Sequence, residues 1–271
     1  MSYSWYPGHM AKAVREIRPL LKLIDVVMEI VDARAPLSSS NPMLKEIAAG
    51  KPTILILNKA DLADQDATNK WIRHFRDEGR NPFATNAESG EGIARALGAF
   101  ASMDIKSRTK ARAIIVGMPN VGKSSLINRL AKKASARTGD KPGITRGRQW
   151  IDIGAAELLD TPGLMPLRVE DPDVWSKLCA LGIISDDLFD REKVAKQLLK
   201  EISDHYPGAL SAKYGFEGLG ANDGETSALE KIAHKKGCLS KGGAVDLDKA
   251  AFLLIKDFRS GRIGRISLER S

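Results

Sequence analysis

The chain has 271 residues, 43% of them hydrophobic and 28% charged, which is typical of a soluble globular protein with one large domain or two modest ones. No apolar run approaches the ~20 residues that span a bilayer, and residues 1–18 lack the apolar core of a secretion signal, so we expect a cytoplasmic protein without a membrane partner. Lysine and arginine outnumber aspartate and glutamate by 42 to 34, a net charge of +8 that favours a polyanionic partner such as nucleic acid, although a soluble protein can be basic without one.

The first 164 residues alternate between helix-like and strand-like segments. Residues 8–23 place apolar side chains at helical spacing with lysine and arginine between them, which predicts an amphipathic basic helix that Pro19 kinks or interrupts. Buried strands that end in polar loops are predicted at 25–34 and 52–61. The remaining predictions for this part are a helix at 68–79, a short strand and glycine-rich turn at 81–92, a helix at 94–102, a strand, glycine loop and helix at 111–133, and two short strands and a loop at 148–164. Strands that alternate with helices imply a mostly parallel sheet covered on both faces, an α/β fold.

After about Asp171 the remaining segments are helix-like, and no strongly β-rich run follows. We therefore predict an α/β domain at residues 1–168 and a smaller, all-helical domain at residues 169–271. Near the C-terminus, FRSGRIGR repeats arginine at every third position and contains two glycines, which predicts a flexible basic tail. Arg259, Arg262 and Arg265 on such a tail would bind a phosphate backbone, or would be solvated if no ligand is present.

The stretch GMPNVGKSS, residues 117–125, matches Gly-x4-Gly-Lys-Ser between an apolar strand and an amphipathic helix. In that context the pattern predicts a phosphate-binding loop, because backbone N–H groups and the helix N-terminus attract anions and Gly122 allows close approach. Lys123 is predicted to bridge the β- and γ-phosphate oxygens, and Ser124 to ligate Mg²⁺. The predicted phosphate-contacting residues are Asn120, Val121, Gly122, Lys123, Ser124 and Ser125.

Two later segments complete the predicted Mg²⁺ and γ-phosphate site. Asp160, in LLDTPG, follows an apolar strand and is predicted to hold Mg²⁺, and the N–H of Gly163 to reach the γ-phosphate. Thr145, in KPGITR, lies between the two motifs and is predicted to complete the Mg²⁺ shell, although KPGIT could instead be a plain turn.

The stretch NKAD, residues 58–61, predicts a site for guanine. The two carboxylate oxygens of Asp61 match the N1–H and N2–H₂ donors of guanine, a pair that adenine lacks, so the fit selects GTP over ATP. Asn58 is predicted to tether the loop and to approach the purine edge, and the stem of Lys59 to cover the ring face.

Two further segments surround the predicted base site. TNAESGEG, at 85–92, resembles a loop whose backbone N–H contacts guanine O6, and Asn86 and Ala87 are the candidates for that contact. Asp32 and Arg34, in VDARAP, follow a strand near the same edge, where they either position other groups or form a loop-stabilising ion pair.

The motifs come in an unusual order: the guanine motif precedes the phosphate loop, and the threonine and DTPG follow. This order, together with WYPGHMAKA, VDARAPLSSSNP and DFRSGRIGRISLE, resembles the YlqF/RbgA family of circularly permuted ribosome-assembly GTPases over nearly the whole chain. The resemblance implies a Ras-like G domain of the P-loop NTPase class and a helical, RNA-contacting C-terminal domain. It also implies that the partner is the maturing large (50S) ribosomal subunit, through rRNA and ribosomal proteins.

Hydrolysis requires an oriented water molecule, which many Ras-like enzymes hold with a glutamine just after DxxG. Leu164 occupies that position, so we predict slow intrinsic hydrolysis that ribosomal particles stimulate. The resemblance of YPGHMA to the family implies that His9 orients the water, with Lys123 and Thr145 as the other catalytic residues; the alternative is a surface or helix-capping histidine. Asn120 resembles the asparagine that binds K⁺ in potassium-dependent GTPases, or is an ordinary loop residue.

Together these features predict a cytoplasmic, monomeric GTPase that binds the maturing large subunit, hydrolyses GTP to GDP and phosphate, and is then released. The expected cofactors are GTP or GDP, Mg²⁺ and K⁺, and no DNA partner is expected. The alternative is an rRNA-binding assembly scaffold that holds GTP as a structural ligand with little turnover. Because DTPGL leads directly into the helical domain, ordering of that segment on GTP binding would move the domain.

Overall fold

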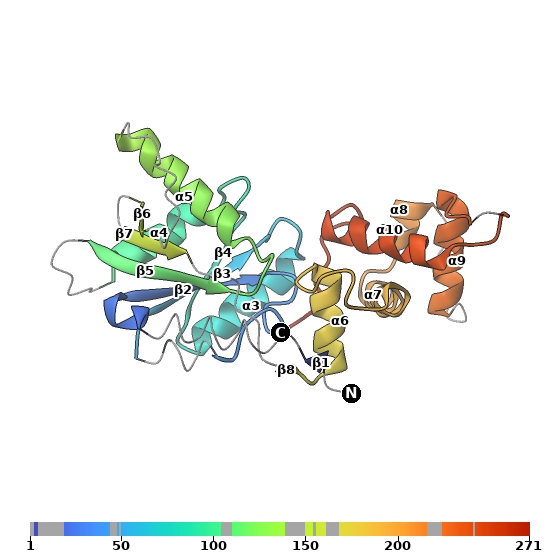
Figure 1. Cartoon of the computed structure of the whole chain (residues 1–271), viewed down its shortest axis with the longest axis horizontal. Helices are drawn as coiled ribbons and strands as arrows, with labels where there is room; N and C mark the ends of the chain where they lie inside the picture. Colours follow the sequence, from blue (N-terminus) through green and yellow to red (C-terminus); the bar gives the residue numbers. More distant parts are fainter. Residues whose placement is uncertain are drawn as a thin grey trace.

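The structure is a computed structural model that describes residues 3–4, 19–43, 48, 50–103, 110–138, 150–153, 156–160, 168–215, 224–240 and 242–271. A sheet with its covering helices forms one end of an elongated molecule, and a bundle of helices forms the other end (Figure 1). Within the described ranges, none of the helices combines the length and the apolar character that a membrane crossing requires.

Six strands form the main sheet, in the order β4-β3-β2-β5-β7-β6. All neighbouring pairs are parallel except β6 and β7, which confirms the prediction of a mostly parallel sheet. Every residue of the central strand β2 is buried, because helices cover both faces of a parallel sheet. In sheet order the strands are β4 (Asn81–Ala84), β3 (Thr53–Asn58), β2 (Val26–Asp32), β5 (Ala111–Gly117), β7 (Ala156–Asp160) and β6 (Trp150–Asp152).

Alternate residues of the strands pack on opposite faces of the sheet. Ile54 and Ile56 of β3 belong to a cluster with residues of α4 (Ile93–Ala101) and α5 (Lys123–Thr138). Leu55 and Leu57 pack instead with Trp71 and Phe75 of α3 (Gln65–Asp77). This period-two alternation places α3 on one face of the sheet and α4 and α5 on the opposite face.

One predicted helix begins earlier than expected, and another lies mostly outside the described residues. The side chain of Asp64 accepts a hydrogen bond from Ala67 N at 2.7 Å, so α3 begins at Gln65, about one turn before the predicted start. Most of the predicted N-terminal basic helix lies outside the described residues; the part inside them is η1 (Leu20–Leu23), a short 3₁₀ helix whose N-cap is Pro19.

The helical part agrees with its prediction and contains one additional helix. Its helices are α6 (Pro172–Leu181), α7 (Arg191–His205), α8 (Ala209–Tyr214), α9 (Glu225–Lys236) and α10 (Leu247–Arg259). The unpredicted helix is α8, whose six residues between two left-handed glycines are too few to show helical periodicity. Beside α6, β8 (Arg168–Val169) pairs antiparallel with β1 (Tyr3–Ser4).

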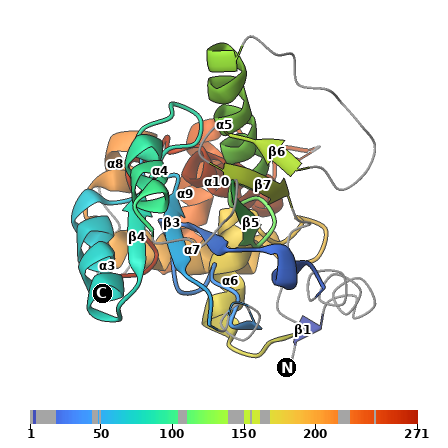
Figure 2. The same ribbon diagram turned by 90° about the vertical axis from the view of Figure 1, so that its left-hand side faces the viewer.

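The prediction of a flexible basic tail is wrong. After α10 the chain returns to the sheet part, and its last residue lies beside α3 in both views (Figures 1 and 2). Ile266 and Leu268 are only 2% and 4% exposed, and Trp71 Nε1 donates to Glu269 O at 3.2 Å. The alternating apolar residues of the tail are buried against the sheet part, and this burial fixes the segment despite its glycines. The division at residue 168/169 stays a prediction, although residues 265–269 of the predicted helical domain contact the sheet part.

Candidate functional site

Residues of motifs that lie far apart in the sequence meet at one edge of the sheet. Asp32 ends β2, Asn58 ends β3, Gly117 ends β5 and Asp160 ends β7. These four strands are adjacent and parallel, so their carboxyl ends face the same crevice, where open α/β sheets bind ligands. The reversed order of the motifs along the chain therefore does not separate them in space.

Asn58 joins the guanine motif to two other loops. Its Nδ2 donates to Val121 O of the phosphate loop at 2.8 Å, and its Oδ1 accepts from Ala87 N at 3.0 Å and Thr85 Oγ1 at 3.2 Å. The residue is 2% exposed, so these bonds replace its contacts with water. Asn58 thus tethers the guanine motif to the phosphate loop and to the 85–87 loop. Thr85 is a partner that the sequence did not reveal.

The phosphate loop approaches Asn58 so closely that Gly122 cannot carry a side chain. Its φ is +105°, and a Cβ there would lie 2.1 Å from Asn58 Nδ2. Asn120 and Lys59 also have positive φ values, of 60° and 59°, which cost free energy for residues other than glycine. The two strained residues are bonded to each other, because Lys59 Nζ donates to Asn120 O at 2.7 Å.

Asp32 is a buried anion at the centre of this edge. Arg34 binds its carboxylate through two nitrogens, at 2.9 and 2.8 Å, and Lys59 Nζ lies 3.0 Å from Oδ2. Burial alone would raise the pKa of Asp32, but the charges and hydrogen bonds of Arg34 and Lys59 hold it well below its usual value. Asp32 and Arg34 therefore do both things that the sequence left open. Their ion pair stabilises the loop, and Asp32 also positions Lys59.

Arg34 also connects this edge to the helical part. Its Nη1 donates to Phe258 O and Arg259 O at 3.5 and 3.4 Å, at the C-terminal end of α10. Its guanidinium carbon lies 5.0 Å from the centre of the Phe258 ring. The negative end of the helix dipole favours a cation at this position.

In the phosphate loop, the ammonium group of Lys123 lies over the loop backbone. Nζ donates to Met118 O at 2.7 Å and to Gly117 O at 3.2 Å, and the residue is 8% exposed. Ser124 and Ser125 are exposed in the first turn of α5. Asn120 Nδ2 donates to Gly182 O, just after α6, at 2.7 Å. The loop therefore contacts the helical part directly.

The predicted base site is open at Asp61, whose side chain is exposed. The N–H groups of the two candidates for guanine O6 already have partners, because Ala87 N donates to Asn58 Oδ1 and Asn86 N to Glu91 O at 3.0 Å. Their role toward guanine stays a prediction. Gly92 shapes this loop, since a Cβ there would lie 2.0 Å from the carbonyl oxygen of Ala84.

Four predicted site residues lie wholly or partly outside the described part of the chain. His9, Thr145 and Gly163 are not among the described residues. The backbone of Asp160 pairs with Ile115 at the end of β7, but its side chain is not described. The predicted contacts of these residues with water, Mg²⁺ and the γ-phosphate stay predictions.

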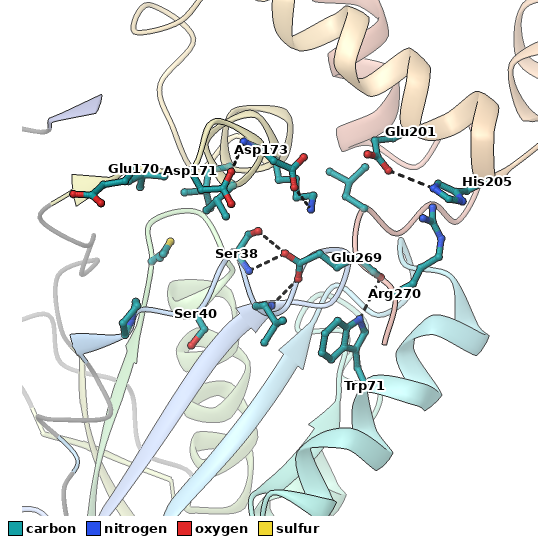
Figure 3. A pocket seen from close by; sticks show the side chains of 18 residues that line it. Ser38, Ser40, Trp71, Glu170, Asp171, Asp173, Glu201, His205, Glu269 and Arg270 are labelled. Atoms are coloured by element: carbon teal, nitrogen blue, oxygen red, sulfur yellow. Dashed lines mark hydrogen bonds and ion pairs between the residues drawn. The ribbon is translucent and has the colours of Figure 1, made fainter. Parts of the chain in front are cut away.

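A separate cavity of about 720 Å³ lies between the two parts of the molecule (Figure 3). Among the residues that the structure describes, no predicted nucleotide-site residue lines it, and Met118 is the lining residue that belongs to the phosphate loop. Glu269 lies at its centre and accepts hydrogen bonds from Leu37 N at 2.7 Å and Ser38 N at 2.9 Å. The cavity is thus part of the junction between the tail and the sheet, and the nucleotide motifs converge elsewhere.

Known proteins are similar to this chain in sequence and in fold. Residues 112–204 match the family described as 50S ribosome-binding GTPase. Ribosome biogenesis GTPase A of Bacillus licheniformis is 44% identical over 100% of this chain and 99% of its own length. The crystal structure of GNP-bound YlqF from T. maritima has a TM-score of 0.71 and 30% identity over 96% of this chain and 98% of that one. The GDP-bound YlqF structure has a TM-score of 0.72 and 28% identity, and covers 94% and 99%. By the identity and coverage of its relatives, the chain belongs to the ribosome biogenesis GTPase A family.

Proposed function

We propose that the protein is a cytoplasmic, monomeric GTPase that binds the maturing large ribosomal subunit, hydrolyses GTP and is then released. Membership of the ribosome biogenesis GTPase A family supports the reaction and the partner. The net charge of +8 supports a partner rich in phosphate, and the proposal includes no membrane or DNA partner.

One observation carries the proposal most directly. The amide of Asn58 holds the phosphate loop through Val121 and the 85–87 loop through Ala87, so the guanine motif and the phosphate motif are parts of one site. A guanine nucleotide carries its base and its phosphates in one molecule, so one ligand would use both motifs. A site with these connections is preorganised, which lowers the entropy cost of binding.

The side chains present have suitable chemistry for a magnesium-bound triphosphate. Mg²⁺ prefers oxygen ligands, and the hydroxyl of Ser124 at the start of α5 with the carboxylate of Asp160 at the end of β7 would provide them, together with Thr145. Bound Mg²⁺ would neutralise charge that develops on the phosphate oxygens. Lys123 would exchange its loop carbonyls for β- and γ-phosphate oxygens.

Two further side chains and several backbone N–H groups complete the proposed mechanism. His9 would orient the attacking water, because Leu164 has no polar atom at the position that glutamine often occupies. The amide of Asn120 donates to Gly182 through Nδ2, so Oδ1 is the atom that would bind K⁺. The backbone N–H groups at the start of α5 and of Gly163 would bind phosphate oxygens.

The alternative is a scaffold that holds GTP as a structural ligand, and Leu164 is the observation that favours it. A turnover assay separates the two functions: GTP hydrolysis is measured with and without purified large subunits, in K⁺ and in Na⁺. We expect multiple turnovers that large subunits stimulate, faster in K⁺ than in Na⁺, and a large loss of stimulation in His9→Ala. Turnover that large subunits do not stimulate would contradict the proposal and favour the scaffold.

A further inference from the structure

The loop that carries Asp61 is held from two sides. On the sheet side, Ala60 N donates to Thr85 O at 3.0 Å, and within the loop Leu62 N donates to Lys59 O at 3.0 Å. On the opposite side lies residue segment 265–267 of the C-terminal tail, about 200 residues later in the chain. Ile266 N donates to Leu62 O at 3.1 Å, and Ser267 Oγ accepts from Asp64 N at 3.0 Å.

Arg265 makes the most extensive contact with this loop. Its Nε donates to Ala63 O at 2.9 Å, and its Nη2 donates to Ala60 O at 2.8 Å and to Gln65 Oε1 at 3.1 Å. The guanidinium thus bridges carbonyls on both sides of Asp61 and leaves the carboxylate of Asp61 exposed. The fixed fork of an arginine is suited to such a bridge, whereas a lysine has a single nitrogen.

The packing of the tail makes this bridge specific. Ile266 and Ser267 are 2% and 0% exposed, so the backbone on one side of Arg265 has a fixed position. Gly261 passes so close to the same loop that a Cβ there would lie 2.7 Å from Leu62 Cδ2. Arg262, three residues before Arg265, differs from it: its side chain is 60% exposed, and its Nη1 lies 3.5 Å from Asp257 Oδ1 of α10.

We propose that Arg265 is a positioning residue for guanine recognition, which acts through the 60–63 backbone to hold Asp61 in place. This inference rests on the proposed function, in which Asp61 pairs with the N1–H and N2–H₂ groups of guanine. Discrimination by hydrogen bonds requires acceptors that are held in position, because a mobile carboxylate adapts to the wrong base or to water. The tail that follows the last helix is thereby a part of the nucleotide site.

The test compares GDP with IDP, which lacks the 2-amino group and so offers Asp61 one donor fewer. Calorimetry gives both dissociation constants for the full-length wild type, Arg265→Gln and the matched control Arg262→Gln. We expect the preference of the wild type for GDP over IDP to fall by about threefold to tenfold in R265Q, the range that corresponds to one hydrogen bond. The ratio should stay within about twofold of the wild type in R262Q.

A second variant keeps the charge and separates positioning from phosphate binding. Arg265→Lys retains the cation that a nucleic acid would attract, but its single nitrogen replaces the two separate nitrogens with which Arg265 reaches Ala63 O and Ala60 O. We expect R265K to lose the preference for GDP over IDP as R265Q does. Circular dichroism determines whether each variant folds. If R265Q does not fold, R265K provides the same test.

The remaining outcomes contradict either the role of Arg265 or the proposed function itself. An unchanged ratio of GDP to IDP affinity in R265Q and R265K, with normal binding of GDP, would overturn the role of Arg265 and leave the proposed function intact. An equal loss in R262Q would show that any charge removed from the tail has this effect, and would also overturn it. A wild-type protein that binds neither nucleotide would overturn the proposed function itself.

Discussion

Single residues at the nucleotide edge are constrained mainly by what lies against them. Gly122 has a positive φ and almost no room for a Cβ, and the atom it would strike is the amide nitrogen that bonds to Val121 O. Gly98 in α4 is the opposite case, because nothing lies within 4 Å of a Cβ there and its φ is ordinary. The two glycines therefore form a matched pair for substitution by alanine.

We expect Gly122→Ala to break the bond between Asn58 and Val121 and to lower GDP affinity at least tenfold, since strain and a lost hydrogen bond together exceed about 1.4 kcal/mol. Gly98→Ala should bind GDP normally and gain about 0.5–1 kcal/mol of stability, because alanine favours the helix. Calorimetry with GDP and urea unfolding measure both effects. Normal GDP affinity in G122A would contradict the constraint at this position.

The buried ion pair of Asp32 predicts a pH dependence. The folded protein holds the pKa of Asp32 below its usual value of 3.8, so the unfolded chain binds a proton first as the pH falls. The stabilising contribution is therefore complete above about pH 4 and is lost as the pH falls toward the lowered pKa. Urea unfolding between pH 5 and pH 2 should show a steeper loss in the wild type than in Asp32→Asn.

The control for this experiment is Asp204→Asn, in which an exposed aspartate of α7 is replaced. It should keep the acid dependence of the wild type. At neutral pH we expect D32N to lose about 3–5 kcal/mol, because Arg34 and Lys59 lose their buried partner. If D32N and the wild type lost stability in parallel below pH 4, Asp32 would not be the source of the effect.

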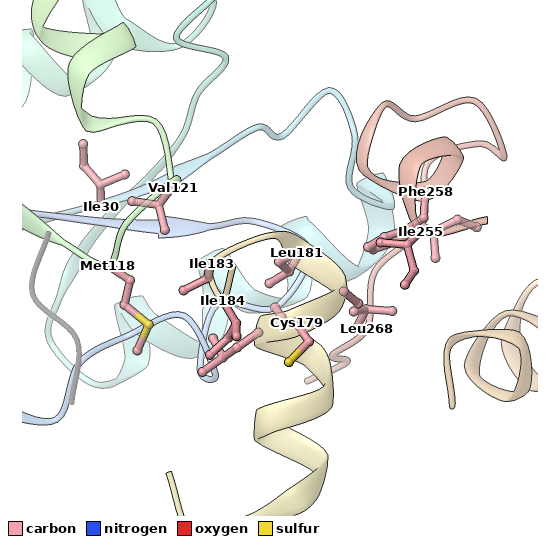
Figure 4. Packing of buried hydrophobic residues seen from close by; sticks show 14 of the residues in the cluster. Ile30, Met118, Val121, Cys179, Leu181, Ile183, Ile184, Ile255, Phe258 and Leu268 are labelled. Atoms are coloured by element: carbon pink, nitrogen blue, oxygen red, sulfur yellow. The ribbon is translucent and has the colours of Figure 1, made fainter. Parts of the chain in front are cut away.

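Among the elements, the C-terminal tail differs most from what its composition suggests. Its glycines and arginines are typical of a flexible segment, yet buried Ile263, Ile266 and Leu268 attach it to the rest of the core. Figure 4 shows Leu268 beside the end of α6, near Phe258 of α10. Arg259 also fixes the start of the tail, because it donates to Cys179 O at 2.7 Å and binds Asp186 at the same distance.

Glu269 is the polar anchor of this element. Its carboxylate accepts from Leu37 N, Ser38 N and Ser38 Oγ, in the loop that follows β2. We expect Glu269→Ala to cost about 1–3 kcal/mol, because two backbone N–H groups lose their acceptor. Urea unfolding measures this cost, and Glu230→Ala, at an exposed position of α9, is the control with a change below about 0.5 kcal/mol. Equal stability of E269A and E230A would show that the tail does not depend on this anchor.

At the scale of the whole molecule, the sheet part and the helical part share one hydrophobic cluster. The cluster includes Ile30 and Ile115 of the sheet, Leu198 and Leu254 of the helices, and Leu268 of the tail. Polar contacts cross the same junction, from Arg34 to the end of α10 and from Asn120 to Gly182. Parts that are joined in this way stabilise each other.

We therefore expect one cooperative unfolding transition, although the two parts differ in architecture. Far-UV circular dichroism and tryptophan fluorescence should give coincident urea transitions. Ile266→Ala, which removes a buried side chain of the tail, should lower both midpoints together and cost about 2–5 kcal/mol. Two separated transitions, or a shift confined to one probe, would show that the parts unfold independently.

The sequence by itself determined the α/β class, the parallel strands, the phosphate loop and the family resemblance. These features depend on short stretches whose local conformation and hydrophobic period are visible in the chain, such as the glycine loop between β5 and α5. The family comparison confirms the resemblance. Lys59, Asp61 and Lys123 could be predicted as site residues for the same reason, since each lies inside a contiguous motif.

Only the tertiary structure decided which distant polar groups form hydrogen bonds with the residues of these motifs. Thr85 binds Asn58, Arg34 binds the end of α10, and Arg265 holds the loop of Asp61. Each of these bonds joins residues 27 to 225 positions apart, and no local pattern in the sequence specifies the partner of a hydrogen-bond donor. The tail shows the same limit, because its glycines predicted flexibility from local propensity, whereas the burial of its apolar side chains against a distant part of the chain decided its conformation.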